Sequence, residues 1–195
     1  MCGRYYLTDK TAYEVEDDLH LSRGALATPS GDISPGMATP GIIWNKGIDE
    51  DILLSDLFWG ILSRDKKLII NARAESVKEK SMFSESIMHR RCILPAAGFY
   101  EWDVSKTKFK FKRTDNKPIY LAGFYDLSEN RDSFVILTTA ANASMKPVHD
   151  RMPVMIDKGN VRDYLKDSTA ALEMLSEPMP ELDRSSDYEQ LSLFD

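Results

Sequence analysis

The second residue of the chain is a cysteine, and this position can combine two reactive groups on one residue. Initiator methionine is normally removed when the next residue is small, so that Cys2 becomes the first residue. Its amine and its thiol both have reference pKa values near ~8. Such an aminothiol condenses with an aldehyde and closes a five-membered thiazolidine ring through the sulfur. Two alternatives stay open: an acyl-transfer thiol nucleophile, and a cysteine that is merely buried in the core.

Two further segments carry side chains suited to proton transfer or polar binding. INARAES places Asn71, Arg73 and Glu75 at alternate positions after an apolar stretch, so an extended chain would point them the same way. In GFYEW, Glu101 stands between two aromatic residues, which predicts a raised carboxyl pKa and a role in proton transfer. The structural alternatives are a surface salt-bridge array and an exposed strand glutamate.

The remaining candidates are a histidine and several basic residues. In VHDRMP, His149 suits proton transfer near neutral pH and Arg151 suits phosphate binding, although a single histidine is often structural. Arg4 and the alternating lysines of KTKFKFKR could contact a phosphodiester backbone. Lysines interleaved with aromatics also protect edge strands from aggregation, and we favour this interpretation for KTKFKFKR.

Composition and charge limit the class of protein. The chain has 195 residues, 43% hydrophobic and 29% charged, which is typical of a soluble globular domain. It lacks a run of about 18 apolar residues, so we expect no membrane span. Its two cysteines and three histidines lack metal-ligand spacing, so we expect neither a metal nor another cofactor. The net charge is −6, and residues 161–195 hold the whole excess, which leaves room for a basic DNA-binding face elsewhere.

The pattern of elements predicts an α+β fold. We expect helices over 9–21, 77–90 and 161–176, and a long irregular loop over 23–41, which is rich in Gly, Pro and Ser. Strands are expected in GIIWN, DILLSDLFWGIL, KLIIN, RCILPA, GFYEWDV, KFKFKRT, PIYLAGFYDL, SFVILTTAAN and the end of HDRMPVMI, with SFVILTTAAN central.

Strands outnumber helices and follow one another as hairpin-like neighbours. The sequence therefore predicts a single compact domain with mainly antiparallel sheets in a barrel-like core and helices at the periphery. We place this domain at residues 1–176 and a polar tail at residues 177–195.

Taken in chain order, several short motifs resemble one family. They are MCGRY, SPG, WG, INARAE, RCILPAAGFYEW, LTTAAN and HDRMPV, spread over about residues 1–157. The set is similar to the SOS-response-associated peptidases, also described as abasic-site processing proteins. The resemblance implies antiparallel sheets around a DNA groove. It also implies that the N-terminal cysteine captures the open-chain aldehyde of an abasic deoxyribose in single-stranded DNA as a thiazolidine crosslink.

The resemblance also assigns roles to residues at matching positions. Cys2 would supply thiol and amine, Asn71 would hold the cysteine and the sugar-phosphate, and Glu101 would be the acid-base for imine formation. His149 would assist ring opening of the sugar and reversal of the crosslink. The positions expected to contact DNA are Arg4, Arg73, Arg151, Thr138 and Pro35. The same residues would remove the N-terminal methionine or a short propeptide.

The end of the chain predicts a protein partner. QLSLF resembles the peptide that binds the bacterial sliding clamp, and would bury Leu191, Leu193 and Phe194 in a groove while Gln190 leads the motif. The alternative is a segment docked on its own domain. We therefore expect a cytoplasmic monomer, recruited to replication forks at the nucleoid, whose partners are single-stranded DNA with abasic sites and the clamp. An N-terminal-cysteine peptidase or amidohydrolase that does not act on DNA is the alternative function.

Overall fold

The computed structural model describes residues 2–26, 31–47, 51–127 and 131–186. The chain begins with β1 (Arg4–Leu7), followed by α1 (Asp9–Leu19). The hydroxyl of Thr8 accepts a hydrogen bond from the Thr11 backbone N–H at 3.2 Å, which caps the helix at its start. His20 ends the helix in the left-handed conformation, with φ of 58°. The helix predicted over 9–21 is confirmed, and it stops two residues early because of this cap.

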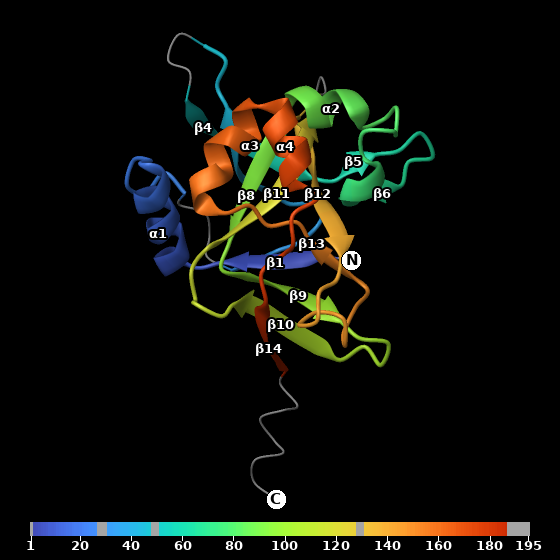
Figure 1. Ribbon diagram of the computed structural model, residues 1–195. Coiled ribbons are helices and arrows are strands. Elements are labelled where there is room, and N and C mark those ends of the chain that lie inside the picture. Colours follow the sequence, from blue (N-terminus) through green and yellow to red (C-terminus); the bar gives the residue numbers. More distant parts are fainter. Residues whose placement is uncertain (1, 27–30, 48–50, 128–130, 187–195) are drawn as a thin grey trace, which may run out of the picture.

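The larger sheet closes on itself around the core. Its ring consists of β3 (Ala38–Trp44), β4 (Ile52–Trp59), β8 (Arg91–Ala96), β11 (Ile119–Asp126) and β12 (Ser133–Ala140). β11 pairs with β8, β8 with β3, β3 with β4, β4 with β12, and β12 returns to β11. All of these pairings are antiparallel except β4 with β12. The expected barrel-like core and the central place of SFVILTTAAN are confirmed (Figure 1).

Two short strands attach to β12 and bring distant motifs together. β7 (Asn71–Arg73) runs parallel to it and places Arg73 opposite Thr138. β13 (Arg151–Pro153) runs antiparallel to it and places Arg151 opposite Ala140. INARAE and HDRMPV, about 80 residues apart in the chain, therefore flank one strand. β5 (Ile61–Leu62) and β6 (Leu68–Ile69) form a separate small hairpin.

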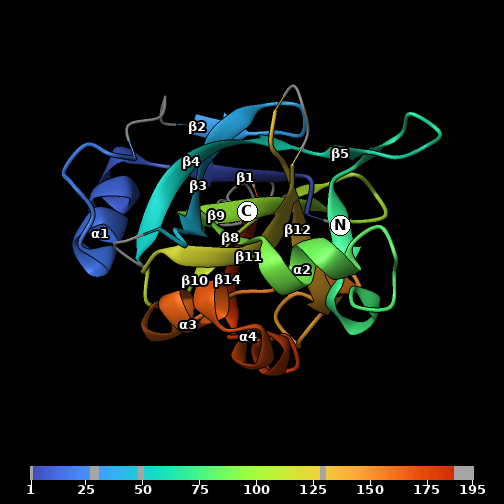
Figure 2. The ribbon, with the colours of Figure 1, turned by 90° about the horizontal axis from the view of Figure 1, so that it is seen from above.

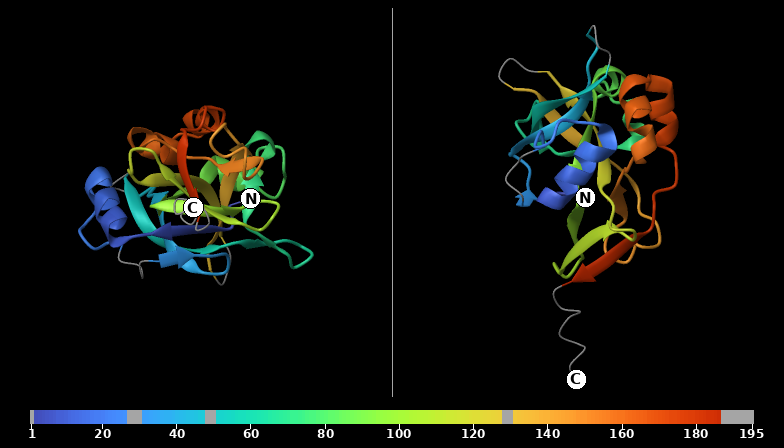
Figure 3. Two further views of the ribbon diagram at one scale, coloured as in Figure 1. Left: turned by 90° about the horizontal axis from the view of Figure 1, so that it is seen from below. Right: turned by 90° about the vertical axis from the view of Figure 1, so that its left-hand side faces the viewer.

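The second sheet has the order β14-β10-β9-β1-β2. Besides β1 it contains β2 (Gly31–Ile33), β9 (Gly98–Trp102), β10 (Lys108–Arg113) and β14 (Leu182–Ser186). Two predictions need correction. KFKFKR is an interior strand, because β14 covers it (Figure 3). Part of the expected tail is thus a strand of the sheet, since Phe111 and Arg113 of β10 pair with Arg184 and Leu182.

Strand alternation gives this second sheet two different faces. The inner face carries Tyr5, Phe99 and Phe111, each fully buried, together with Glu101 at 4% exposure. The outer face carries the residues in register with Arg4, namely Tyr100 and Lys110, and their neighbours two positions away. The predicted loop over 23–41 is wrong in part, because β2 and the start of β3 lie within it.

The α-helices other than α1 lie on the side of the barrel opposite β2 (Figure 2). They are α2 (Ser84–His89), α3 (Val161–Lys166) and α4 (Ser168–Met174). The helix predicted over 161–176 is broken at Asp167, whose extended backbone ends α3 and whose carboxylate caps α4 by accepting from the Thr169 and Ala170 N–H groups. The helix predicted over 77–90 begins only at Ser84, after turns and the 3-10 helix η1 (Ala74–Ser76).

A buried arginine fastens these short helices to the barrel. Arg91 at the start of β8 is 3% exposed, and its guanidinium donates to the backbone carbonyls of Ile87 and Met88 in α2. It also donates to the carbonyls of Tyr164 and Leu165 in α3. Carbonyls at a helix C-terminus lack intrahelical partners and attract cations. Arg91 therefore compensates for helices that are too short to be stable alone.

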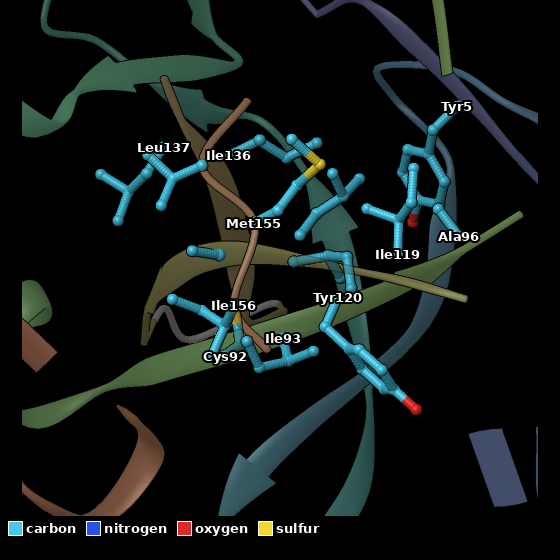
Figure 4. Close-up of a cluster of buried hydrophobic side chains, with 14 of the residues drawn as sticks. Tyr5, Cys92, Ile93, Ala96, Ile119, Tyr120, Ile136, Leu137, Met155 and Ile156 are labelled. Carbon is cyan, nitrogen blue, oxygen red and sulfur yellow. The ribbon is translucent and has the colours of Figure 1, made fainter. Parts of the chain in front are cut away.

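One continuous hydrophobic core fills the domain. Figure 4 shows part of it, with side chains contributed by β1, β8, β11 and β12 and by Met155 and Ile156. The hydroxyl of Tyr120 points away from this cluster and donates to the Asp18 carboxylate at 2.9 Å. None of the described helices is long and apolar enough to cross a bilayer.

Candidate functional site

Cys2 lies between the two sheets and is held there by Asn71. Cys2 lies two residues before the first residue of β1, and only 1% of its surface is exposed. The side-chain amide of Asn71, at the start of β7, donates to the Cys2 carbonyl at 2.9 Å. One hydrogen bond therefore joins the beginning of the chain to the larger sheet. Asn71 Oδ1 is buried and has no hydrogen-bond partner among the described residues, so it can accept a hydrogen bond from a ligand.

Glu101 and His149 form the second part of the site. Glu101 projects from β9 toward the interior, and His149 comes from the loop before β13. His149 Nε2 lies 3.6 Å from Glu101 Oε1. The Arg151 backbone N–H donates to His149 Nδ1 at 2.9 Å. The Asp150 carboxylate also lies 3.0 Å from Nδ1, so this nitrogen is held on one side of the ring while Nε2 faces Glu101.

The electrostatic environment keeps the Cys2 thiol protonated. Burial, which is the larger cause, and the negative charge of the nearby Glu101 carboxylate together raise the thiol pKa to about 12. A hydrogen bond from the Arg4 backbone acts in the opposite direction but is weaker. Cys2 is thus a neutral thiol at physiological pH, and a base must take its proton before the sulfur can attack.

Arg151 is held in place by the Glu75 carboxylate of the 3-10 helix η1. Its two terminal nitrogens donate to the two oxygens of Glu75, each at 2.7 Å, and Nη2 also donates to the Thr138 carbonyl at 2.6 Å. Arg151 holds the pKa of the Glu75 carboxyl at about 2. These hydrogen bonds of Arg151 connect η1 to β12 and β13, and the Glu75 carboxylate balances the charge of the Arg151 guanidinium.

Arg4 and Arg73 are the more accessible cations of the site. The Arg4 guanidinium is 3.7 Å from the Asp32 carboxylate in β2 and lies over the Trp102 ring, 5.5 Å from its centroid. Arg73 is exposed at the end of β7, and no described carboxylate lies within ion-pair distance of it. Each arginine follows a site residue by two positions in the chain, Arg4 after Cys2 and Arg73 after Asn71.

The structure corrects several details of the predicted site. Tyr100 and Trp102 do not surround Glu101, because neighbouring strand residues point to opposite faces. Glu75 pairs with Arg151, a partner that its position in INARAES did not reveal. Thr138 is 1% exposed and donates to the Ala72 carbonyl at 3.4 Å, so its side chain lines no open surface in this structure.

Pro35 is half-buried in the turn between β2 and β3, which backbone hydrogen bonds of Gly36 and Met37 fasten to Trp59. Gln190, Leu191, Leu193 and Phe194 lie outside the described residues. Asp32, the partner of Arg4, was missed by the sequence reasoning, because only the pairing of β1 with β2 brings it close. The described residues contain no group of three or more His, Cys, Asp or Glu side chains arranged for a metal ion.

Comparison with known proteins places this fold and sequence in a family. A crystal structure from Bordetella bronchiseptica shares the fold, with a TM-score of 0.76 and 23% identity over 95% of this chain and 99% of that one. A crystal structure from Bacteroides thetaiotaomicron has a TM-score of 0.75 and 21% sequence identity, over 95% of this chain and 91% of that one. The molecule is thus an α+β domain of this type with a cysteine site between its sheets.

Sequence comparison names the family. The family model "SOS response associated peptidase (SRAP)" matches residues 1–190, and the chain belongs to this family. Among its relatives is the abasic site processing protein YoaM of Bacillus subtilis, 32% identical over 90% of this chain and 83% of the relative. The abasic site processing protein YoqW of the same bacterium is also 32% identical, over 85% and 80%.

Proposed function

We propose that this protein is a DNA-damage response protein that captures abasic sites in single-stranded DNA through Cys2. The observation that carries the proposal is the linked set of Cys2, Asn71, Glu101 and His149, which combines an aminothiol with two proton-transfer groups. The family membership and the names of the relatives, abasic site processing proteins, support abasic DNA as the substrate.

The proposed reaction begins with the amine rather than with the sulfur. An abasic sugar is mostly a closed hemiacetal, and His149 would transfer the proton that opens it to the aldehyde. The free amine of Cys2, exposed by removal of Met1, attacks the aldehyde carbon. The resulting carbinolamine loses its hydroxyl as water when Glu101 delivers a proton, and an imine remains.

Ring closure then uses the thiol. The Cys2 sulfur adds to the imine carbon, its proton passes to the nitrogen through Glu101, and the thiazolidine forms with one water lost overall. The high thiol pKa is consistent with this order, because a positively charged iminium beside the sulfur favours the thiolate that the resting site disfavours. Asn71 would fix the Cys2 backbone so that both nucleophilic atoms reach one carbon.

The same residues would act in N-terminal processing. Removal of Met1 requires attack on the carbonyl that precedes Cys2, and the thiol with Glu101 as its base is the nucleophile we propose for it. Arg4 and Arg73 would hold phosphates on either side of the abasic sugar. Arg151, already paired with Glu75, would act on DNA only where a phosphate competes with that carboxylate.

The decisive experiment compares two forms of the protein that differ at the start of the chain. One has a free Cys2 amine, and the other carries an additional alanine before Cys2. With an abasic single-stranded oligonucleotide, we expect only the first to give an adduct whose mass is the sum of both molecules less one water. An adduct of equal yield from both forms would disprove the amine mechanism. Peptide turnover without DNA, and no adduct, would favour the amidohydrolase alternative.

The clamp-binding segment is proposed separately, since it lies outside the described residues. We propose that Gln190, Leu191, Leu193 and Phe194 bind a sliding clamp and so bring the protein to replication forks. A pull-down with purified clamp should retain the native chain and lose the L193A/F194A variant. Equal retention of both would refute the recruitment proposal and leave the proposed chemistry unaffected.

A further inference from the structure

The outer face of the second sheet carries an unusual combination of cations and aromatic rings. Lys108 Nζ lies 3.7 Å from the centroid of the Tyr100 ring, and Lys110 Nζ lies 4.4 Å from that of Tyr6. The Tyr6 and Tyr100 rings are neighbours, with centroids 5.2 Å apart. We call this surface the cationic-aromatic face, consisting of Arg4, Tyr6, Tyr100, Trp102, Lys108 and Lys110.

The face was expected to be an edge strand protected by lysines, and its position in the sheet excludes that role. β10 pairs with β9 on one side and with β14 on the other, so its backbone is not open to another strand. The edges of this sheet are β14 and β2. Lysines that block edge pairing would be required there and not on β10.

The lysines of this face hold charge that the described protein does not neutralise. Lys112, further along β10, has the Asp183 carboxylate at 4.0 Å, and Arg4 has Asp32. Lys108 and Lys110 have no described carboxylate within ion-pair distance, although the whole chain has a net charge of −6. The aromatic rings beneath them instead keep both ammonium groups at the surface, through cation–π contacts.

A glycine allows the rings to lie close to the sheet. Gly98 is on the same face as Tyr6 and pairs with it across β1 and β9. A Cβ at position 98 would lie 2.4 Å from the Tyr6 hydroxyl oxygen and 2.3 Å from the Phe111 carbonyl oxygen. Only glycine therefore lets Tyr6 lie over this position and support Lys110.

The face is continuous with the Cys2 site. Arg4 is two residues from Cys2, lies over the Trp102 ring, and is directly opposite Tyr100 in the sheet. Tyr100 is in turn opposite Lys110, and Trp102 opposite Lys108. Because neighbouring strands lie about 4.8 Å apart, the cations from β1 to β10 span roughly 10 Å. This span is similar to the length of one or two nucleotides of an extended single strand.

We propose that the cationic-aromatic face binds the single-stranded DNA that flanks an abasic site held at Cys2. Lys108 and Lys110 contact phosphates, and the part-exposed rings of Tyr100 and Trp102 offer surfaces on which unpaired bases stack when Lys108 moves to a phosphate. This combination of cations and aromatic surfaces is the recognition chemistry of single strands without sequence preference. The assignment rests on the proposed function, because it extends the strand from the captured sugar.

The test measures binding of an intact 20-nucleotide single strand by fluorescence anisotropy from 50 to 300 mM salt. The variant K108Q/K110Q should lower the salt slope by about 1.4 and the affinity roughly tenfold at 0.15 M salt, because two phosphate contacts are lost. The matched control K10Q/K166Q removes two exposed lysines from α1 and α3 and should bind like the native chain. Equal affinities for the two double variants would overturn the proposal.

Adduct formation by the native chain with an abasic strand is measured in parallel, so that the two proposals can fail separately. Loss of binding in K108Q/K110Q, without any adduct from the native chain, would keep the face and reject the crosslink chemistry. An adduct from the native chain, with unchanged binding by K108Q/K110Q, would reject the face and keep the chemistry. The abasic oligonucleotide can also be shortened on the side of the abasic site that contacts the face. The native chain and K108Q/K110Q should then bind the shortened strand with equal affinity.

Discussion

The two cysteines lie in two regions that are equally buried but chemically different. Cys2 is 1% exposed and Cys92 is 0% exposed, and burial raises the thiol pKa of both. Around Cys92, in β8 of the barrel, burial is the one cause of the shift. Around Cys2 the shift has a second cause, the Glu101 carboxylate, and Asn71 and His149 complete a polar set.

The comparison shows that a buried thiol becomes a candidate for catalysis only when proton carriers share its surroundings. Isolated in an apolar barrel, Cys92 behaves as a small hydrophobic residue. Cys2 lies where two sheets meet, and each sheet contributes polar groups: Glu101 comes from one, and Asn71 and His149 come from strands and loops attached to the other. If the two regions are independent, changes around Cys92 should alter stability, and changes around Cys2 should alter adduct formation.

Removing each sulfur in turn gives the largest expected difference. Cys2→Ala should reduce adduct formation with an abasic strand to background, because no sulfur remains to close the ring. Cys92→Ala should keep the native adduct yield and lower the free energy of unfolding by about 1 kcal/mol, through a small core cavity. Adduct yield on denaturing gels and chemical denaturation measure the two effects. Loss of adduct in folded Cys92→Ala would contradict the separation.

Glu101→Gln should slow adduct formation by about 10² or more, because an isosteric amide cannot transfer the proton. The same change should lower the thiol pKa of Cys2 from about 12, since it removes a negative charge beside the sulfur. The pH dependence of Cys2 alkylation, measured in the Cys92→Ala background, reports this shift. Asp150→Asn is the control, because Asp150 contacts the other nitrogen of His149 at 3.0 Å and is mostly exposed. Equal effects of both changes would argue against a special role for Glu101.

Arg91→Met should affect the barrel region and not the site. Carbonyls at the ends of α2 and α3 would lose their donors, and we expect a loss of about 3 kcal/mol in unfolding free energy. Arg90→Met is the matched control, since Arg90 makes more exposed ion pairs with Glu85 and Asp126 and should cost less than 1 kcal/mol. Adduct formation per folded molecule should be unchanged in both variants. A slower reaction in folded Arg91→Met would show that the regions are coupled.

The smallest effect concerns the Glu75–Arg151 pair. The pKa of Glu75 is lowered in the folded protein to about 2, so the pair contributes stability above pH ~4.5, and this is lost as the pH falls toward 2. Glu75 is half exposed, and solvent limits the contribution to below about 1 kcal/mol. Glu75→Gln should remove this part of the pH dependence in acid denaturation curves. An unchanged acid denaturation curve would mean that the Glu75–Arg151 pair contributes nothing to stability.

Local sequence patterns were sufficient for most strands and for the first helix. Alternating Lys and Phe predicted β10, and the apolar run SFVILTTA predicted a central strand, because side-chain periodicity follows directly from strand geometry. The break at Asp167 and the strand Leu182–Ser186 were not predicted. Asp167 is a helix cap only because the chain turns there to pack on Arg91, and β14 forms only because β10 offers it a free edge.

The sequence by itself determined which chemical groups the protein has and the family to which it belongs, since motif spacing survives without coordinates. Tertiary structure alone decided what each group faces. Glu75 pairs with Arg151, Tyr100 and Trp102 point away from Glu101, and Lys108 and Lys110 lie over aromatic rings with no described carboxylate within ion-pair distance. The physical reason is that pairing between strands far apart in the chain sets neighbours and burial, and these set charge balance and pKa. No local pattern contains that information.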